Sequence, residues 1–329
     1  MKEPVRWGIL STANIGRAIL RGIGLSKDSC VHAVASREWT RASEWAKDHG
    51  IPRAFGAYDD MLESGEVDVV YNPLPNSLHA EWTIKALDAG LSVLCEKPFA
   101  ANAEEARRVA AVAIRTGRVV AEAFMYRFHP IYEEVLSLLR DGAIGEVLTI
   151  RSTFAFRLED RSNIRASKEL AGGALMDVGC YCVNLARLIA GCEPIEAQAF
   201  ERRTTVDDTL LGALRFPNGI LSQFQCSIEN RAGSGTEIVG TAGKILIEKP
   251  WFPGEDQGQI IVQHGDKREE ITTPGANCYH LEIDDFVAAH RTHRTLRWPV
   301  EDAVANMAVI DALYASAKEG VVAPVEQAH

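Results

Sequence analysis

The sequence lacks three features that would each point to a particular class of protein. No apolar run approaches the roughly 18 residues of a membrane-spanning helix, so we expect no membrane partner. Basic residues are dispersed among more numerous acidic ones, for a net charge of −10, and no basic stretch favours nucleic acid. The seven cysteines show no spacing typical of metal ligands, so we expect no metal site.

The cysteines also indicate a compartment. An odd number of dispersed cysteines is typical of free thiols in a reducing environment, and we expect them to be buried. Residues 1–5 pass directly into a predicted strand, without the charged and apolar regions of a signal peptide. We therefore expect a cytoplasmic protein.

The rest of the composition is that of an ordinary globular protein. Hydrophobic residues make up 47% of the 329 residues and charged residues 24%. A chain of this length predicts two domains with ample cores.

The first half opens with a degenerate nucleotide-binding motif. A predicted strand over residues 5–10 is followed by a turn and a helix to about residue 25. The spacing is that of the dinucleotide fingerprint G-x-G-x-x-G, but Ser11 and Ala13 replace the first two glycines and only Gly16 remains. Small residues still allow backbone amides to approach a pyrophosphate at the helix N-terminus. A plain strand, turn and helix explains this motif equally well.

The end of the second predicted strand, residues 31–36, indicates which cofactor would bind. NAD-binding domains place an acidic residue here for the ribose 2′-hydroxyl, whereas this chain has Ser36 and Arg37, with Arg41 one helical turn later. A hydroxyl and two guanidinium groups suit a 2′-phosphate. The sequence therefore favours NADP over NAD, although both arginines could also be solvated charges at a helix start.

Strands and helices continue to alternate through the first domain. Strands are predicted at residues 67–71, 91–95 and 119–123, and helices at 41–49, 77–89, 102–115 and 130–140. Ser77 is expected to cap its helix after the rigid loop 72–76, and Gly90 to end it. This alternation predicts an α/β Rossmann domain with a doubly wound parallel sheet over residues 1–124.

One predicted strand ends in Glu96-Lys97-Pro98. Because ligands bind outside the carboxyl ends of the strands in such a sheet, Lys97 is placed where chemistry occurs. Proline restricts the residue before it, so the backbone of Lys97 has few conformations. A surface turn with a solvated lysine is the alternative for this tripeptide alone.

After about residue 125 the pattern becomes long alternating segments, which predict an α+β domain over residues 125–329 with a large open, mostly antiparallel sheet. The strands are predicted at residues 147–156, 195–203, 209–216, 219–228, 236–240, 244–247, 259–263 and 268–273, with a hairpin turn at 216–220. One face of such a sheet needs a cover. We expect a homodimer or homotetramer formed through it.

A helix predicted over residues 172–188 interrupts these strands. Asp177, Tyr181 and Asn184 fall at i, i+4 and i+7 and share one face, while the neighbouring positions are small or apolar. A buried polar stripe needs partners. It could serve a ligand, or Asp177 and Tyr181 could simply satisfy each other or the backbone.

Three motifs, in this order, resemble those of the glucose-fructose oxidoreductase / inositol dehydrogenase (Gfo/Idh/MocA) family, and the resemblance covers nearly the whole chain. They are Gly8-Ile9-Leu10-Ser11-Thr12-Ala13-Asn14-Ile15-Gly16, Glu96-Lys97-Pro98 and Gly172-Gly173-Ala174-Leu175-Met176-Asp177-Val178-Gly179-Cys180-Tyr181. The resemblance implies that Lys97 and Asp177 are active-site residues, that the nicotinamide lies between the domains, and that a cis bond precedes Pro98. Many members have histidine where this chain has Tyr181. Tyrosine is similar to the branch with glucose-fructose oxidoreductase, D-xylose 1-dehydrogenases and dimeric dihydrodiol dehydrogenases, where it is the catalytic acid/base.

The resemblance also completes the expected site. Cofactor contacts are expected from Ser11, Thr12, Ala13, Asn14, Ile15, Ser36, Arg37, Arg41, Pro73, Asn76, His79, Glu96, Lys97 and Arg127. Substrate contacts are expected from Lys97, Arg165, Asp177, Tyr181 and Asn184, within a pocket wall that includes parts of residues 154–165 and 251–257. Arg127 is expected near the interdomain cleft, and His129, before Pro130, is expected to begin a helix rather than to act as a catalyst.

The expected reaction is NADP-dependent oxidation of a hydroxyl on a sugar, such as an aldose, or on a cyclic diol. Free tyrosine titrates near pH 10, about three units too high for a base at neutrality, and an adjacent ammonium group lowers that pKa. We therefore expect Tyr181 to move the proton and Lys97 to supply the charge, with Asp177 orienting Lys97 or binding a hydroxyl. Lys97 as the proton carrier remains an alternative.

Three other readings of the whole protein stay open. The enzyme could transfer hydride between two sugars with tightly bound NADP. The chain could instead be a non-catalytic sensor of NADP or sugar, because fold alone does not establish function. A purely structural two-domain protein is disfavoured by the arginines after the second strand.

Overall fold

The computed structural model describes residues 3–327, which form two compact units. The first comprises residues 3–125 together with Asn277–Val304, and the second comprises Tyr126–Ala276 together with residues 305–327. The domains expected from the sequence, 1–124 and 125–329, differ from these units in where 277–304 belong. Residues 1 and 2, on which the expectation about a signal peptide partly depended, and residues 328 and 329 lie outside the described part.

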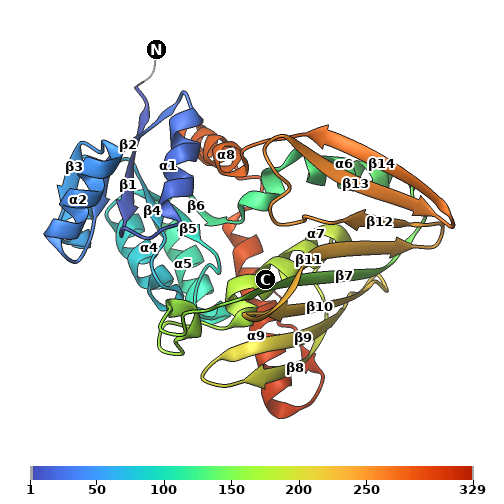
Figure 1. Ribbon diagram of the computed structural model, residues 1–329. Coiled ribbons are helices and arrows are strands. Elements are labelled where there is room, and N and C mark those ends of the chain that lie inside the picture. The colour runs from blue at the N-terminus through green and yellow to red at the C-terminus, as the bar shows by residue number, and fades with distance from the viewer. Residues whose placement is uncertain (1–2, 328–329) are drawn as a thin grey trace. The chain divides into compact units, whose positions relative to one another are not determined.

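The first unit is built on a six-stranded parallel sheet in the order β3-β2-β1-β4-β5-β6 (Figure 1). This order, with its reversal between β1 and β4, is that of a doubly wound dinucleotide-binding sheet, so the predicted Rossmann domain is confirmed. The strands are β1 (Val5–Leu10), β2 (Ser29–Ala35), β3 (Arg53–Phe55), β4 (Val69–Asn72), β5 (Ser92–Glu96) and β6 (Val120–Ala123). The helices between them are α1 (Gly16–Leu25), α2 (Trp39–His49), α3 (Tyr58–Glu63), α4 (His79–Asp88) and α5 (Ala103–Thr116).

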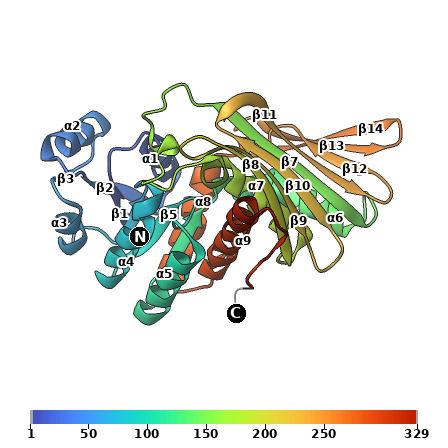
Figure 2. The same ribbon diagram turned by 90° about the horizontal axis from the view of Figure 1, so that it is seen from below.

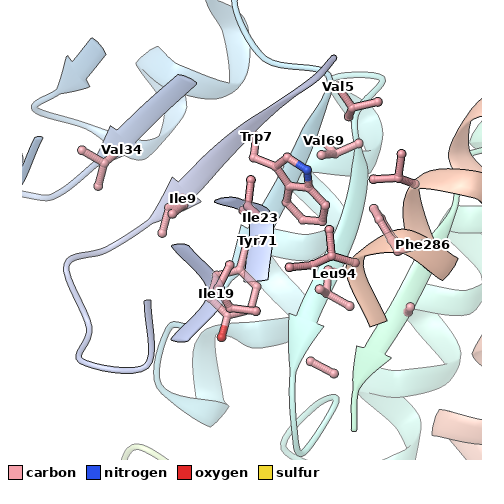
Figure 3. Packing of buried hydrophobic residues seen from close by; sticks show 14 of the residues in the cluster. Val5, Trp7, Ile9, Ile19, Ile23, Val34, Val69, Tyr71, Leu94 and Phe286 are labelled. Carbon is pink, nitrogen blue, oxygen red and sulfur yellow. The ribbon is translucent and has the colours of Figure 1, made fainter. Parts of the chain in front are cut away.

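A helix from late in the chain, α8 (Cys278–Thr292), completes the core of this unit. Its buried face packs beside α1 on the central strands, and the rings of Trp7 and Phe286 lie 5.5 Å apart between their centroids (Figure 3). Trp7 is fully buried, so without α8 a large apolar side chain of β1 would be left uncovered. This packing is why residues 277–304 belong to the first unit.

The start of α4 differs from expectation. Ser77 was predicted to cap this helix, but a 3-10 turn, η1 (Asn76–Leu78), precedes it and α4 begins at His79 without a side-chain cap. The predicted cap is therefore wrong, because the chain already turns helically before α4 begins. Gly90 does follow the helix with a positive φ of 83°, as its role at the helix end requires.

The second unit contains a nine-stranded sheet in the order β14-β13-β12-β11-β7-β10-β9-β8-β15. Among the described strands of this second sheet, only β10 and β7 pair in parallel, so the predicted mostly antiparallel sheet is confirmed. The strands are β7 (Val147–Arg157), β8 (Glu196–Arg203), β9 (Asp207–Arg215), β10 (Leu221–Ser227), β11 (Glu229–Gly240), β12 (Lys244–Ile247), β13 (Gln257–His264), β14 (Lys267–Pro274) and β15 (Ala323–Pro324).

Helices cover one face of this sheet (Figure 2). They are α6 (Pro130–Arg140) on β13 and β14, α7 (Cys180–Ala190) on β7 and β10, and α9 (Val300–Glu319), whose Ser316 accepts a hydrogen bond from the backbone of Ala199 in β8. Side chains on the opposite face alternate with the buried ones and include the exposed Phe200 and Leu211.

Two expectations about composition can be compared with the described residues. All seven cysteines are free, but only Cys95, Cys180, Cys182 and Cys226 are buried, whereas Cys30, Cys192 and Cys278 are partly exposed. The expectation of burial is therefore wrong for three of them. Within residues 3–327 no helix is both long and apolar enough to cross a membrane.

Candidate active site

The turn between β1 and α1 keeps the shape of a dinucleotide loop without its first two glycines. Ser11 adopts a positive φ of 79°, a conformation that favours glycine, and its hydroxyl accepts a hydrogen bond from the backbone of Ala13 (3.2 Å). In the part of the chain that is described, no group accepts a hydrogen bond from the backbone N–H of Thr12, Asn14 or Ile15. These donors at the N-terminus of α1 suit an anionic diphosphate.

The third fingerprint glycine has a packing role. A side chain on Gly16 would press against the ring of Trp45 on α2, which would lie 3.3 Å from the added carbon. Glycine therefore lets the first helix approach Trp45 closely, whereas a larger residue would require that ring to shift slightly.

Beyond β2, two arginines converge on one tyrosine. Burial raises the pKa of Tyr58, and the guanidinium groups of Arg37 and Arg41 both oppose that rise, which places them near its hydroxyl. Both arginines are exposed, whereas Ser36 is buried and its hydroxyl accepts a hydrogen bond from the backbone of Glu38 (3.4 Å). A cationic pair at the end of β2 fits a ribose 2′-phosphate.

The loop after β4 contains the next expected cofactor residues. Pro73 is buried and Asn76 is half-buried. Asn72 holds the loop, because its side chain accepts a hydrogen bond from the backbone of Leu74 and donates one to the carbonyl of His79. The ring of His79 is 1% exposed and both its nitrogens lie 2.7 Å from backbone carbonyl oxygens, so it contacts protein rather than an open site.

The loop after β5 carries Lys97, which is half-buried. The peptide bond between Lys97 and Pro98 is cis, as the family resemblance implied. Glu96 accepts a hydrogen bond from the hydroxyl of the fully buried Tyr71 (2.5 Å), so its carboxylate is directed at protein.

In the second unit, His129 caps α6. Its Nδ1 accepts a hydrogen bond from the backbone of Ile131 (3.1 Å), so its Nε2 carries the proton and donates to the carbonyl of Gly254 (3.0 Å). Burial lowers the pKa of His129, which favours this neutral form. The prediction of a helix-start residue is confirmed. Arg127 is 3% exposed, so its side chain is buried.

The helix predicted over 172–188 is divided into two parts. A π-helical turn, η4 (Leu175–Gly179), holds Asp177, and α7 follows with Tyr181 and Asn184. Single π-helical turns are frequent at functional sites. The expected uniform helical stripe is therefore interrupted between Asp177 and Tyr181.

Two glycines bring a loop up to η4. A side chain on Gly172 would overlap the backbone of Arg165, and one on Gly173 would overlap the carboxylate of Asp207. This close approach places the Arg165 Nε 2.8 Å from the Asp177 Oδ2. The structure thus brings together two of the residues expected to contact substrate.

Asp207, at the start of β9, anchors the same turn. Its carboxylate accepts hydrogen bonds from the backbone of Leu175 (2.7 Å) and from the hydroxyl of Tyr314 on α9 (2.9 Å). Burial is the main cause that raises the pKa of Asp207 to about 6, against the effect of these hydrogen bonds. Asp207 therefore caps the first residue of the π-helical turn that contains Asp177.

Aromatic side chains surround Tyr181. Its ring centroid lies 5.4 Å from that of Phe154 and 5.7 Å from those of Tyr126 and Trp251. Phe154 stacks on Trp251 and also contacts Phe252, whose side chain is exposed. The expected pocket-wall segments, 154–165 and 251–257, thus each contribute a ring beside Tyr181.

Asn184 lies at the edge of this aromatic cluster and is fully buried. Its Oδ1 accepts a hydrogen bond from the hydroxyl of Tyr126 (2.7 Å), whereas its Nδ2 has no partner within residues 3–327. An unused buried donor is costly, which makes this amide a candidate contact for a ligand hydroxyl.

Comparison with known proteins identifies the chain. A family model described as an oxidoreductase family with an NAD-binding Rossmann fold matches residues 5–124, and the GFO/IDH/MocA C-terminal domain matches residues 132–246. D-xylose 1-dehydrogenase (NADP(+)) 2 of Haloferax volcanii is 36% identical over 320 residues, which cover 95% of this chain and 98% of the relative. The chain belongs to the GFO/IDH/MocA family.

Two other similar proteins show how far this family likeness extends. Trans-1,2-dihydrobenzene-1,2-diol dehydrogenase of Mus musculus is 35% identical and matches 80% of this chain and 79% of its own. A 3-ketoreductase from Actinomadura kijaniata, solved in complex with NADP and TDP-benzene, superposes with a TM-score of 0.91 at 29% identity, over 95% of this chain and 98% of the ketoreductase. This GFO/IDH/MocA protein is an oxidoreductase enzyme with an NAD(P)-binding domain, in the branch with D-xylose 1-dehydrogenases and dihydrodiol dehydrogenases.

Some residues at the site of this GFO/IDH/MocA protein were not found from the sequence. Asp207, Tyr314 and Tyr126 support the segment with Asp177 and Tyr181, but they lie far from it along the chain. No local signal indicated Asp207, because the predicted strand began only at residue 209, whereas β9 begins at Asp207.

Proposed function

We propose that the protein is an NADP-dependent dehydrogenase that transfers hydride between the nicotinamide and a hydroxyl of a sugar or cyclic diol. The observation that carries this proposal is the setting of Tyr181. A buried phenol lies among aromatic rings, with the Asp177 carboxylate and the unused Asn184 amide on the same stretch of chain. Aromatic rings suit the apolar faces of a cyclic substrate, and the polar groups suit its hydroxyls.

The cofactor is proposed to be NADP. The fit is supported by the open backbone donors of Thr12, Asn14 and Ile15 and by the cationic pair of Arg37 and Arg41. When bound, the nicotinamide supplies the hydride acceptor or donor. In this proposal Ser11 and Ala13 shape the diphosphate loop, and Ser36 supports the arginines.

Tyr181 is proposed as the acid/base, because its ring lies at the centre of the aromatic cluster, whereas the hydroxyl of Tyr126 is already bonded to the Asn184 Oδ1. At neutral pH it needs a cation to stabilise the phenolate, since free tyrosine titrates near pH 10. Lys97 is proposed to supply that charge in the working enzyme. Asp177, held by Arg165, then binds or orients a substrate hydroxyl, and the Asn184 Nδ2 donates a hydrogen bond to another.

The substrate is proposed to be an aldose or a cyclic diol with vicinal hydroxyls. The names of the relatives, a D-xylose dehydrogenase and a dihydrobenzenediol dehydrogenase, support both classes. A screen of aldoses, inositols and cyclic diols with NADP⁺ and NAD⁺ tests this. Protein that purifies with bound NADP and does not reduce added NADP⁺ would indicate transfer between two sugars instead.

The role of Tyr181 is tested by steady-state kinetics of Tyr181→Phe and Lys97→Met. Each substitution should lower kcat by about 100-fold or more, because general acid/base catalysis contributes effects of that size. Tyr132→Phe is the matched control: its hydroxyl donates to the carbonyl of Pro250, so it should keep kcat within about 3-fold and lose only about 1 kcal/mol of stability. Full kcat in Tyr181→Phe would rule out Tyr181 as the acid/base.

The cofactor preference is tested by replacing Arg37 and Arg41 together with alanine. Loss of two charge-assisted contacts to a 2′-phosphate should raise the KM for NADP⁺ by about 10-fold or more and leave that for NAD⁺ nearly unchanged. Arg53→Ala, which removes an exposed arginine paired with Glu66, is the control. A wild-type preference for NAD⁺ would overturn the assignment.

The protein is proposed to form a homodimer or homotetramer through the open face of the large sheet. Phe200 is 67% exposed and Leu211 50%, and both lie on this face beside Arg151, Gln198 and Gln223. An exposed apolar patch of this kind is typical of an interface. Light scattering after gel filtration should report an oligomer for the wild type and monomers for Phe200→Asp/Leu211→Asp. A monomeric wild type would contradict this assignment.

A further inference from the structure

The loop that carries Lys97 is held on both sides of that residue by buried side chains from three other elements. Tyr71 of β4 donates to the Glu96 carboxylate, and Glu122 of β6 accepts from the backbone of Phe99 (2.8 Å). Between them, the Nδ1 of His79 on α4 lies 2.7 Å from the carbonyl oxygen of Pro98. The Glu96 side chain before Lys97 and the backbone of Pro98 and Phe99 after it are thus bonded to the rest of the first unit.

His79 differs from the other two because it spans two loops. Its Nε2 lies 2.7 Å from the carbonyl oxygen of Leu74, in the loop after β4. That loop has separate support, since Asn72 bonds the Leu74 backbone and also Thr83 on α4. Both loops thus have other anchors, and His79 is a side chain that bonds both of them.

The protonation state limits what the ring can do. Burial lowers the pKa of His79 to about 4; the charge of Lys97 acts in the same direction, and the two carbonyl contacts oppose it. A neutral imidazole has one N–H group, so at neutral pH the ring donates to one carbonyl at a time. The two loops thus compete for a single proton.

We propose that His79 is a positioning residue whose Nδ1–H bond to the Pro98 carbonyl fixes the turn from which Lys97 acts. Its ring is almost fully buried against protein. In this proposal it therefore acts on turnover through the loop with Lys97, without touching substrate or cofactor. This role replaces the direct cofactor contact expected from the sequence. It rests on the proposed catalytic role of Lys97.

Three substitutions of His79 distinguish the roles of its two ring nitrogens. The amide nitrogen of asparagine can reach the place of Nδ1, and that of glutamine the place of Nε2, whereas leucine replaces neither. His79→Asn should keep kcat within about 3-fold of the wild type, because the Pro98 bond survives. His79→Gln and His79→Leu should each lower kcat by about 10-fold, with the KM for NADP⁺ changed by less than about 3-fold.

A double-mutant cycle tests whether His79 acts through Lys97. In a Lys97→Met background, His79→Leu should lower kcat by no more than about 2-fold further, because the group that it positions is gone. Equal losses in both backgrounds would show a merely structural role. Retained kcat in His79→Gln with loss in His79→Asn would assign the effect to the Leu74 loop, and a raised KM for NADP⁺ alone would assign it to the cofactor.

A readout without turnover keeps this inference distinct from the proposed function. Amide hydrogen exchange in the segment 96–101 should be faster in His79→Leu than in the wild type and unchanged in His79→Asn. Unchanged exchange in His79→Leu overturns the inference whether or not a substrate has been found. An inactive wild type, or full kcat in Lys97→Met, would count instead against the proposed function.

Discussion

The two segments that carry the proposed catalytic groups are held in different ways. Lys97 lies on a loop that is fixed by hydrogen bonds of Tyr71 to the Glu96 carboxylate and of His79 and Glu122 to the backbone of Pro98 and Phe99. Tyr181 lies on a helix, where the backbone satisfies itself and the side chain is fixed by packing against aromatic rings. A loop held by a few directed bonds should respond to changes of single atoms, whereas the helical segment should respond to changes of volume.

The largest effect is expected from Gly173→Ala. At this position φ is 127° and a side chain would overlap the Asp207 carboxylate, so η4 must shift and stability should fall by about 4 kcal/mol. The control is Gly191→Ala at the end of α7, where φ is 67° but no atom lies within 4 Å, and about 1 kcal/mol is expected. Urea unfolding measures both. Equal losses of stability in the two variants would contradict this expectation, because the close contact at Gly173 would then not decide the effect.

A somewhat smaller effect is expected from pH on Asp207. Burial raises its pKa from the usual 3.8 to about 6, so the folded protein holds this proton more tightly than the unfolded chain does. The contribution is full below pH 3.8 and is lost as pH rises through 6, a change of about 3 kcal/mol. Asp207→Asn, whose amide can still bond Leu175 and Tyr314, should remove this dependence. Parallel curves for the two proteins between pH 4 and 7 would contradict the assignment.

The smallest effect is expected from Tyr71→Phe, which removes one directed bond from the loop with Lys97. Because half-buried Glu96 can replace the lost partner with water, stability should fall by only about 1 kcal/mol. kcat should nevertheless fall by about 3- to 10-fold, since the backbone next to Lys97 gains freedom. A variant with unchanged kcat would show that the bonds around this loop do not position the lysine.

Much of the fold could be predicted because it depends on local patterns. Alternating strands and helices indicated the Rossmann domain, and alternating apolar positions indicated the second sheet. The cap at Ser77 was wrong because residues 76–78 already form a 3-10 turn. Helix α8 was not predicted from the sequence, and no local signal shows that Phe286 packs against Trp7.

The candidate site could be predicted in part for the same reason. Asp177, Tyr181 and Asn184 were found from their spacing. Arg165 and Asp177 were both expected to contact substrate, and the structure joins them by a hydrogen bond. The pocket-wall segments 154–165 and 251–257 were also expected, and Phe154 and Trp251 from them lie beside Tyr181. The contact of Tyr126 with Tyr181 was not found, because it joins separate elements. Likewise, the spacing of His79 in the chain gave no indication that its ring bonds the Pro98 carbonyl.

The sequence by itself determined the identity of the chemical groups and the order of the secondary structure, because both are written in neighbouring residues. Only the tertiary structure decided how those groups are held. The Asp207 carboxylate caps a turn 32 residues earlier and binds a hydroxyl 107 residues later, and His79 reaches a carbonyl 19 residues away. Such bonds form between residues that are far apart in the sequence, so a local sequence pattern cannot predict them.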